Sequence, residues 1–170
     1  MLRKRITCEA KLKRLGVISD THLKSPNALL ERIVREYFSD VDMILHLGDY
    51  VDYSVAAYLM EHNRLIGVAG NMDPPEVRNR FPIKQVLELE KLKIGIIHGS
   101  GPPFGLESKI RKEFDDVDAI VYGHTHRPVN HRKDGLLFFN PGSPRRSFFS
   151  DPTVGILSAT DTIQGEVLPL

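Results

Sequence analysis

Short apolar runs alternate with longer amphipathic stretches in the first half of the chain. The runs predict buried strands over residues 15–19, 43–47 and 65–69. Between them, apolar positions spaced three and four apart predict helices over residues 25–38 and 54–62. The first helix is expected to begin with Ser25 as its N-cap and Pro26 at its first position. Pro74 and Pro75 then predict a rigid loop, because proline disfavours a helix at the residues before it.

The second half of the chain changes to paired strands. Hairpins are predicted over residues 85–89 with 93–97, 129–132 with 136–140, and 153–158 with 163–168. The turn Lys133-Asp134-Gly135 is typical of a tight hairpin. A short helix over residues 106–114 and a buried strand over residues 118–122 separate the first two hairpins.

This order of elements predicts the fold class. Strands alternating with helices, followed by hairpins, favour an α/β fold with two sheets packed face to face. We expect a four-layer α-β-β-α sandwich of two mixed sheets with flanking helices, and one domain over residues 1–170. The length of 170 residues, 41% of them hydrophobic, is enough for one sizeable core. Residues 1–14, rich in Lys and Arg, are expected to form a solvated leader.

Charge and cysteine content narrow the functional classes. The 23 Lys and Arg residues nearly balance 22 Asp and Glu residues, which argues against nucleic acid as the main partner. A single cysteine, Cys8, excludes an internal disulfide framework. No apolar run approaches about 18 residues, so no transmembrane helix is expected. No signal-peptide pattern follows the basic N-terminus, and we expect a cytoplasmic protein.

Five of the predicted strands end in side chains that can bind metal. In chain order these are Asp20 and His22, Asp49, Asn71, His98, and His124 and His126. Alone, each has an ordinary explanation, such as a turn, a cap or a surface histidine. Together they favour a metal site, because loops beyond the carboxyl ends of neighbouring strands meet at one rim of a sheet.

The types of these seven ligands indicate the chemistry. One ion cannot use two carboxylates, one amide and four imidazoles and still admit a substrate, whereas two ions can if a carboxylate bridges them. Nitrogen and oxygen ligands without thiolate favour Mn, Fe, Ni, Co or Zn over Cu(I) or Ca. Two dications, two aspartates and a bridging hydroxide leave a net positive site that attracts phosphate esters. Two ions about 3.5–4 Å apart can activate water for in-line displacement at phosphorus.

The motifs resemble the five blocks of the calcineurin-like metallophosphoesterases. The blocks are Asp20-x-His22, Gly48-Asp49, Gly70-Asn71, His98-Gly99 and Gly123-His124-Thr125-His126. The small size resembles the single-domain bacterial and archaeal phosphodiesterases of that superfamily, and also the retromer subunit that shares the fold but serves as a scaffold.

The resemblance implies a ligand assignment. It gives the first ion Asp20, His22 and His126, and the second ion Asn71, His98 and His124, with Asp49 bridging both. Mn²⁺ is the expected ion, with Ni²⁺, Fe, Co²⁺ or Zn²⁺ as alternatives.

The expected activity is metal-dependent hydrolysis of a small phosphodiester by attack of a metal-bridging hydroxide on phosphorus. Asp49, Asn71 and His124 would act through the metals and the hydroxide. The alternative is a weakly active or inactive metal-binding scaffold, which would not need all seven ligands. A nuclease is a third reading, and the near-neutral composition weighs against it. No membrane partner is expected.

One position departs from the family pattern. Many members carry histidine after the Gly-Asn pair, where this chain has Met72. Methionine cannot protonate a leaving alkoxide, and losing such a group costs on the order of 10²–10⁴ in rate. We therefore expect diesters with good leaving groups to be preferred over unactivated monoesters.

Further residues have two readings each. Asp73 would orient a ligand or simply form the turn before Pro74. Arg127 would contact a phosphate or lie solvated. Asn140 and Ser143 could line the site, although a plain turn is favoured.

Other side chains are assigned away from the site. His46, inside a strand, is expected to be structural. The apolar loops Pro102-Pro103-Phe104 and Phe148-Phe149 are expected to be core or dimer contacts before a lid, and a homodimer or homotetramer is considered.

Overall fold

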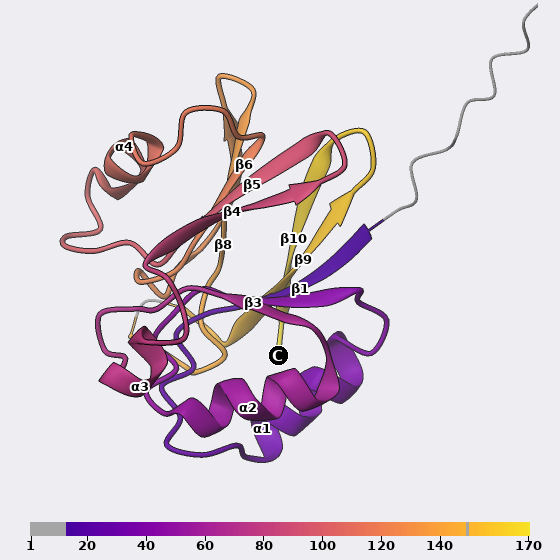
Figure 1. Cartoon of the computed structure of the whole chain (residues 1–170), viewed down its shortest axis with the longest axis vertical. Coiled ribbons are helices and arrows are strands. Elements are labelled where there is room, and N and C mark those ends of the chain that lie inside the picture. Colours follow the sequence, from indigo (N-terminus) through magenta and orange to yellow (C-terminus); the bar gives the residue numbers. More distant parts are fainter. Residues whose placement is uncertain (1–12, 149) are drawn as a thin grey trace, which may run out of the picture.

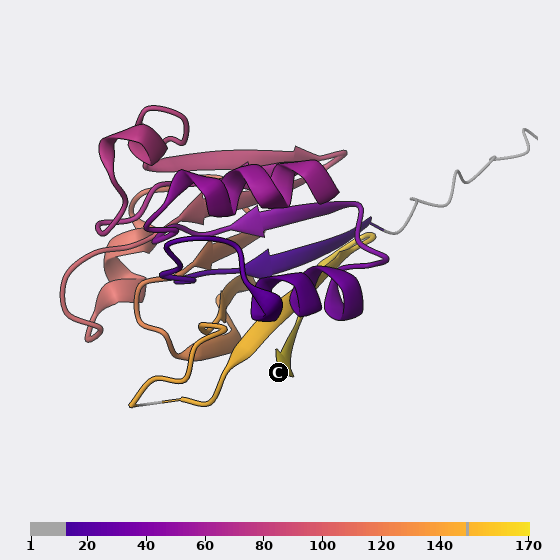
Figure 2. The ribbon, with the colours of Figure 1, turned by 90° about the horizontal axis from the view of Figure 1, so that it is seen from below.

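Two five-stranded sheets face each other in this computed structural model, which describes residues 13–148 and 150–170 (Figure 1). The first sheet has the strand order β10-β9-β1-β2-β3. Its strands are β1 (Lys13–Ile18), β2 (Met43–His46), β3 (Leu65–Gly67), β9 (Thr153–Ala159) and β10 (Ile163–Pro169). Strands β1, β2 and β3 are parallel, and β9 and β10 continue the sheet antiparallel. Figure 2 shows β1 and β2, the indigo and violet arrows, running in the same direction.

The second sheet is also mixed. Its order is β4-β5-β6-β8-β7. The strands are β4 (Lys84–Leu89), β5 (Leu92–Ile97), β6 (Ala119–Tyr122), β7 (Pro128–Lys133) and β8 (Leu136–Pro141). The central strands β5, β6 and β8 are parallel, and the edge strands β4 and β7 are antiparallel to their neighbours. The predicted pair of mixed sheets is therefore confirmed.

The main core lies between the sheets. Because side chains alternate along a strand, Leu15 and Val17 of β1 face inward while Ile18 packs on the helical side. Ile94 and Val121 of the second sheet belong to the same central cluster as Leu15 and Val17. This shared core fixes the two sheets against each other, and with them the loops at their ends.

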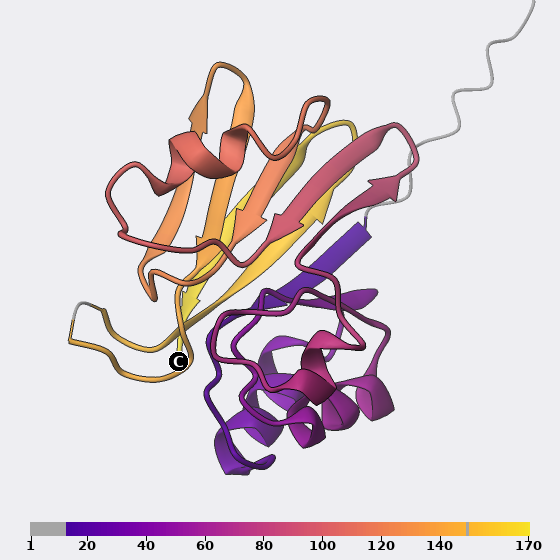
Figure 3. The same ribbon diagram turned by 60° about the vertical axis from the view of Figure 1, so that its left-hand side comes forward.

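Helices cover the outer faces of both sheets. The α1 helix (Ala28–Arg32), its π-helical continuation η1 (Ile33–Tyr37) and α2 (Tyr53–His62) pack on the first sheet. On the other side of the molecule, α4 (Leu106–Arg111) packs on the second sheet (Figure 3). The four layers match the predicted α-β-β-α sandwich.

The first helix differs from its prediction. Asn27, not Ser25, is the N-cap, because its side-chain oxygen accepts a hydrogen bond from the Leu30 backbone N–H at 3.1 Å. The last turn is π-helical, with the Phe38 N–H bonded to the Ile33 carbonyl at 3.1 Å.

Other local predictions also need correction. The loop expected after Pro74 contains a one-turn helix, α3 (Pro75–Arg78), since proline suits the first helical position. Phe104 and Phe148 are 89% and 97% exposed, so neither is a core residue. The leader predicted over 1–14 differs in part, because Lys13 and Arg14 already belong to β1. Residues 1–12, with Cys8, lie outside the described residues, as does Phe149.

Candidate metal centre

The candidate ligands follow the carboxyl ends of β1, β2, β3, β5 and β6. Parallel pairing within each sheet brings these ends to the same edge, as the sequence predicts. The first sheet supplies the ligands up to Asn71, and the second sheet supplies His98, His124 and His126. The site therefore lies where the two sheets meet at one rim.

An unbroken series of short side-chain distances connects all seven candidate ligands. Asp20 Oδ1 lies 3.2 Å from His126 Nε2, which lies 3.3 Å from His22 Nε2. His22 Nε2 lies 3.7 Å from Asp49 Oδ2, which lies 3.4 Å from His98 Nε2.

The remaining two distances of this series join His98, Asn71 and His124. Asn71 Oδ1 lies 3.1 Å from His98 Nε2 and 3.1 Å from His124 Nδ1. Asp49 therefore stands between a group containing His22 and His126 and a group containing Asn71 and His124.

The donor set fits divalent cations. Asp20 Oδ1 is buried and has no hydrogen-bond partner, which is costly for a carboxylate oxygen unless an ion satisfies it. Two sets of ligand atoms lie within 4.8 Å of one another, namely Asp20 with His22 and His126, and Asp20 with Asp49 and His98. Asp20 belongs to both sets, so its carboxylate lies as centrally as that of Asp49.

The backbone at the ligands is strained. Asp20, His22, Asp49, His124 and His126 have φ of 53°, 46°, 57°, 68° and 57°. Residues with side chains rarely adopt this left-handed conformation, which costs on the order of 1–3 kcal/mol each and persists only where the surroundings enforce it. Such a concentration at one rim is typical of a functional site.

Asp73 enforces part of this backbone. Its buried carboxylate accepts hydrogen bonds from the backbone N–H groups of Asp49 (2.9 Å), Gly70 (2.7 Å) and Val51 (2.8 Å). Val51 itself has φ of 76°, which is unusual for a β-branched residue. Asp73 thus holds the loops of two ligands together, whereas a plain turn residue would face solvent.

Two glycines allow the ligand loops to approach closely. A Cβ on Gly48, whose φ is 95°, would stand 2.7 Å from Gly70 N and 2.7 Å from His98 Nδ1. A Cβ on Gly123 would stand 2.8 Å from Asp20 Oδ2 and would collide with the Ser19 hydroxyl. The glycine before each of these ligands is therefore required by contact with the neighbouring loop.

Hydrogen bonds orient the imidazole of His98. Its Nδ1 lies 2.6 Å from the Leu47 carbonyl oxygen, so Nδ1–H donates there and Nε2 faces the site. Burial lowers the pKa of His98, but the hydrogen bond to Asp49 and the charges of Asp20 and Asp49 outweigh it and raise this pKa. The close Asp20 carboxylate likewise raises the pKa of His126, while burial lowers that of His22. Protons and cations therefore compete for the same nitrogens.

Asn140 and Ser143 are the residues that sequence reasoning undervalued. Both are fully buried, unlike residues of a plain turn. Asn140 Nδ2 donates to the Gly123 carbonyl at 2.9 Å, and the Ser143 hydroxyl donates to the Asp20 carbonyl at 2.9 Å. They tie the end of β8 to both ligand loops. The signal available was a polar Asn-Pro-Gly-Ser cluster directly after the apolar residues of β8.

His46 is buried and structural, as expected. The Gly48 N–H donates to its Nδ1 at 3.2 Å, so Nε2–H faces the Thr21 hydroxyl at 3.1 Å. The ring stacks on Tyr50, with centroids 3.5 Å apart, and burial keeps its pKa well below the usual value. The neutral imidazole thereby links the loops that follow β1 and β2.

Met72 and Arg127 lie at the edge of the site. Met72 is 59% exposed, and its backbone N–H donates to Asp49 Oδ1 at 2.8 Å. Arg127 is an exposed residue that directly follows the last histidine ligand. Its role toward substrate is a prediction.

The family model of the calcineurin-like phosphoesterase superfamily domain matches residues 14–162 of this chain. The chain belongs to this superfamily of phosphoesterases, as its motifs predict. Among its relatives, a probable metallophosphoesterase of Methanocaldococcus jannaschii is 36% identical over 160 residues, covering 92% of this chain and 81% of the relative. The phosphodiesterase YfcE of Escherichia coli is 39% identical over 153 residues, covering 78% of this chain and 79% of the relative.

A solved structure confirms the expected fold relationship. Vacuolar Protein Sorting 29 of Cryptosporidium parvum superposes with a TM-score of 0.72 over 94% of this chain and 99% of that protein. At 20% identity this likeness concerns the fold alone. In the described part of the chain, no helix is long and apolar enough to cross a membrane.

Proposed function

We propose that this protein is a binuclear metal-dependent phosphodiesterase. Asp20, His22 and His126 hold one divalent cation, and Asn71, His98 and His124 hold the other, with Asp49 bridging. The absence of thiolate among these ligands and the mixture of imidazole and oxygen donors favour Mn²⁺, with Ni²⁺, Fe, Co²⁺ and Zn²⁺ as alternatives.

One observation carries this proposal. Asp49 Oδ2 lies 3.7 Å from His22 Nε2 and 3.4 Å from His98 Nε2, so one carboxylate oxygen faces a ligand of each proposed ion. A single-ion site would leave part of this connected set without a role.

The protein residues prepare the site for an anionic ester. When bound, a pair of divalent cations supplies an acidified water and positive charge for in-line displacement at phosphorus. Asp73 fixes the Asp49 loop through three backbone N–H groups, and Ser143 and Asn140 fix the loops of Asp20 and His124. Because these bonds are made before substrate arrives, little reorganisation is needed during reaction.

The substrate class follows from the rim. The side chain of Met72 offers no proton donor for a leaving alkoxide, which favours diesters with good leaving groups over unactivated monoesters. The names of the Escherichia coli and archaeal relatives support phosphodiester hydrolysis. The scaffold alternative is disfavoured because all seven ligand side chains are present and converge. A cytoplasmic location and a homodimer or homotetramer stay predictions.

Metal reconstitution tests the proposal. The chain is stripped with chelator, and Mn²⁺, Ni²⁺, Co²⁺, Zn²⁺ and Mg²⁺ are added singly. Hydrolysis of bis(p-nitrophenyl) phosphate and of p-nitrophenyl phosphate is then measured. We expect Mn²⁺ to restore diester hydrolysis and His98→Ala to lower kcat/KM by at least about 100-fold.

The matched control is His62→Ala, a histidine at the end of α2 outside the site, which should leave activity unchanged. Two cations per chain are expected by elemental analysis. Metal binding without turnover of either ester would favour the scaffold, and one cation per chain would contradict the binuclear assignment.

A further inference from the structure

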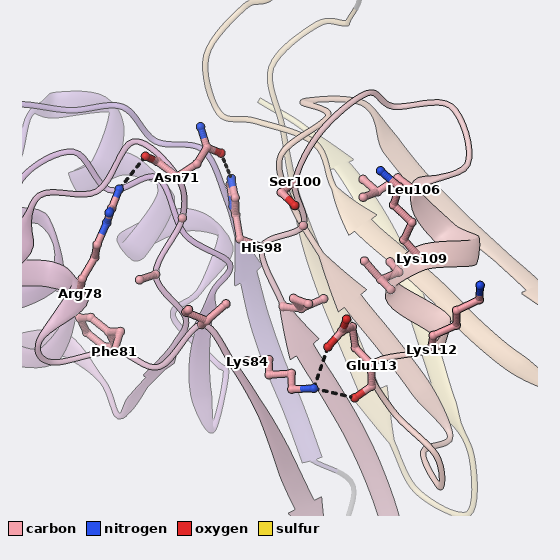
Figure 4. A pocket seen from close by; sticks show the side chains of 16 residues that line it. Asn71, Arg78, Phe81, Lys84, His98, Ser100, Leu106, Lys109, Lys112 and Glu113 are labelled. Carbon is pink, nitrogen blue, oxygen red and sulfur yellow. Dashed lines mark hydrogen bonds and ion pairs between the residues drawn. The ribbon is translucent and has the colours of Figure 1, made fainter.

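A long groove continues from the candidate metal centre into the space between α3 and α4 (Figure 4). Its lining includes Asn71, Arg78, Ile83, His98, Lys109 and Lys112. Asn71 and His98, whose side chains meet at 3.1 Å, belong both to the groove and to the proposed metal centre. A substrate whose phosphate binds at the proposed metal centre can therefore extend one of its ester arms into this groove.

The size of the groove exceeds what a phosphate group requires. Its volume is about 930 Å³, at the upper end of the roughly 300–1,000 Å³ that binding sites for whole small molecules occupy. Figure 4 shows the ion pair of Lys84 and Glu113, at 2.7 Å, across the groove away from Asn71 and His98. The space between these two ends suits a complete ester arm of nucleoside size.

The floor of the groove is apolar. Phe81, Ile97, Leu106 and Ile110 line it, and all four are buried against the protein. Ile83 also lines the groove and is 77% exposed. Such an exposed isoleucine within an apolar groove is typical of a surface that a ligand covers. A flat heterocyclic ring would cover Ile83 and remove this apolar surface from water.

The rim of the groove is positively charged. Arg78, Lys84, Lys109 and Lys112 line it, and the one carboxylate among the lining residues, Glu113, is already paired with Lys84. Within the described residues, Lys109 and Lys112 form no ion pair. The Arg78 guanidinium donates to the Asn71 carbonyl at 2.8 Å and pairs with no described carboxylate. The groove therefore offers cationic groups to a second anion, separate from the phosphate held at the metals.

We infer that the groove binds the nucleoside arm of a phosphodiester that carries a second phosphate, with the base on the apolar floor and the second phosphate at Lys109 and Lys112. This rests on the proposed function and narrows its substrate class to short linear nucleotides bearing an additional phosphate. Lys109 lies in the last turn of α4 and Lys112 is the C-cap of this helix, three residues later, and both line the groove.

Two chromogenic diesters test this directly. One is the p-nitrophenyl ester of thymidine 5′-phosphate, and the other is the same ester bearing a 3′-phosphate. In both, water adds to phosphorus, the bond from phosphorus to the p-nitrophenolate oxygen breaks, and one proton is released. The leaving group and nucleoside are identical, so any difference in KM reports the second phosphate.

The decisive variant is Lys109→Gln with Lys112→Gln, measured on the full metal-loaded chain. We expect wild type to have a lower KM for the 3′-phosphorylated ester, and the variant to raise that KM by about fivefold to tenfold. Its KM for the unphosphorylated ester and its kcat for bis(p-nitrophenyl) phosphate should change by less than about twofold. About 1 M salt should remove the preference in wild type, because it screens exposed charges.

The matched control is Lys91→Gln with Lys133→Gln, which removes two lysines at the turns farthest along β5 and β7 from the metal rim. Nuclear magnetic resonance gives a readout independent of turnover. Thymidine 3′,5′-bisphosphate added to metal-free protein should shift amide signals of residues 106–112 in wild type and less in the Lys109 and Lys112 variant.

The outcomes separate the two proposals. Equal KM values for the two esters in wild type, or a variant that keeps the wild-type preference, would overturn the groove assignment while diester hydrolysis stands. Failure of every metal to support hydrolysis of any diester would overturn the proposed function, and the groove assignment with it.

Discussion

The carboxylate of Asp73 lies 2.9 Å from the backbone nitrogen of Asp49 and does not face solvent. The same oxygen accepts the N–H of Gly70 at 2.7 Å. One side chain that binds no ion in the proposed assignment therefore sets the position of Asp49, the proposed bridging ligand. Loss of a partner of this kind typically costs about 10- to 100-fold in metal affinity or activity.

Replacing Asp73 with Asn tests this role. An amide has only one acceptor oxygen, so one of the backbone N–H groups of Asp49 or Val51 would face an NH₂ group instead. We expect the affinity for Mn²⁺, measured by isothermal titration calorimetry, to fall about 10- to 100-fold while the fold is retained. Asp151→Asn, at an exposed carboxylate, is the control. Unchanged affinity in Asp73→Asn would show that the turn alone positions Asp49.

Met72→His tests the basis of the diester preference. Met72 is 59% exposed beside the ligand Asn71, so an imidazole fits there without repacking the core. A proton donor at this place should raise kcat/KM for an alkyl phosphomonoester by on the order of 10²-fold or more. Met60→His, at a partly exposed position on α2, should leave kcat/KM for the same monoester unchanged. An unchanged kcat/KM for the monoester in Met72→His would show that the absence of a histidine at this position does not cause the diester preference.

Ser143→Ala tests the link between β8 and the first ligand loop. The substitution leaves the buried Asp20 carbonyl without its hydrogen bond from the Ser143 hydroxyl. We expect the free energy of unfolding to fall by about 1–3 kcal/mol, measured by urea denaturation of the metal-free chain. Ser108→Ala, on the exposed face of α4, should change it by less than about 0.5 kcal/mol. Equal stability of the two variants would contradict a structural role for Ser143.

The cap of α2 gives a pH-dependent prediction. The hydroxyl and backbone N–H of Ser54 both donate to Asp52 Oδ1, at 2.6 and 2.9 Å, and lower the pKa of Asp52. Because the folded-state pKa is the lower one, this stabilisation is present above the unfolded pKa of about 3.9 and is lost as the pH falls through the folded value.

Asp52→Ala should therefore lower the free energy of unfolding by about 1 kcal/mol at pH 7. The difference from wild type should shrink in acid below the unfolded pKa. Asp52→Asn, which keeps a capping oxygen, should retain most of the stability at pH 7. A deficit in Asp52→Ala that stays constant down to the acid transition would contradict the contribution of the charged cap.

The pattern of hydrophobic positions was sufficient to predict the four layers and the sheet edge at which the candidate ligands gather. Runs such as residues 43–47 and 118–122 are short, apolar and bounded by polar residues, so their burial follows from composition. The placement of Ser143 depends on its 2.9 Å bond to the Asp20 carbonyl, 123 residues earlier in the chain, and Asn140 bonds to the Gly123 carbonyl, 17 residues earlier. No local sequence pattern encodes either contact. The left-handed backbone conformation of Asp49 could not be predicted from the sequence for the same reason, because tertiary hydrogen bonds enforce it.

The starts of helices were harder to predict. Ser25-Pro26 has the composition of a helix start, yet Asn27 provides the cap because its side-chain oxygen reaches the Leu30 N–H. Ser and Asn are both favoured at the N-cap, so composition alone does not choose between Ser25 and Asn27.

The division of the ligands between the sheets has a consequence for how the protein is held together. Asp49 follows strand β2 of one sheet and His98 follows strand β5 of the other, so they meet only when the sheets have docked. Ions bound between them would stabilise the docked arrangement of the two sheets. At a free metal concentration 100 times Kd, binding would add about 2.7 kcal/mol to the free energy of unfolding. The concentration of free metal would then set the thermodynamic stability of the folded chain as well as its chemistry.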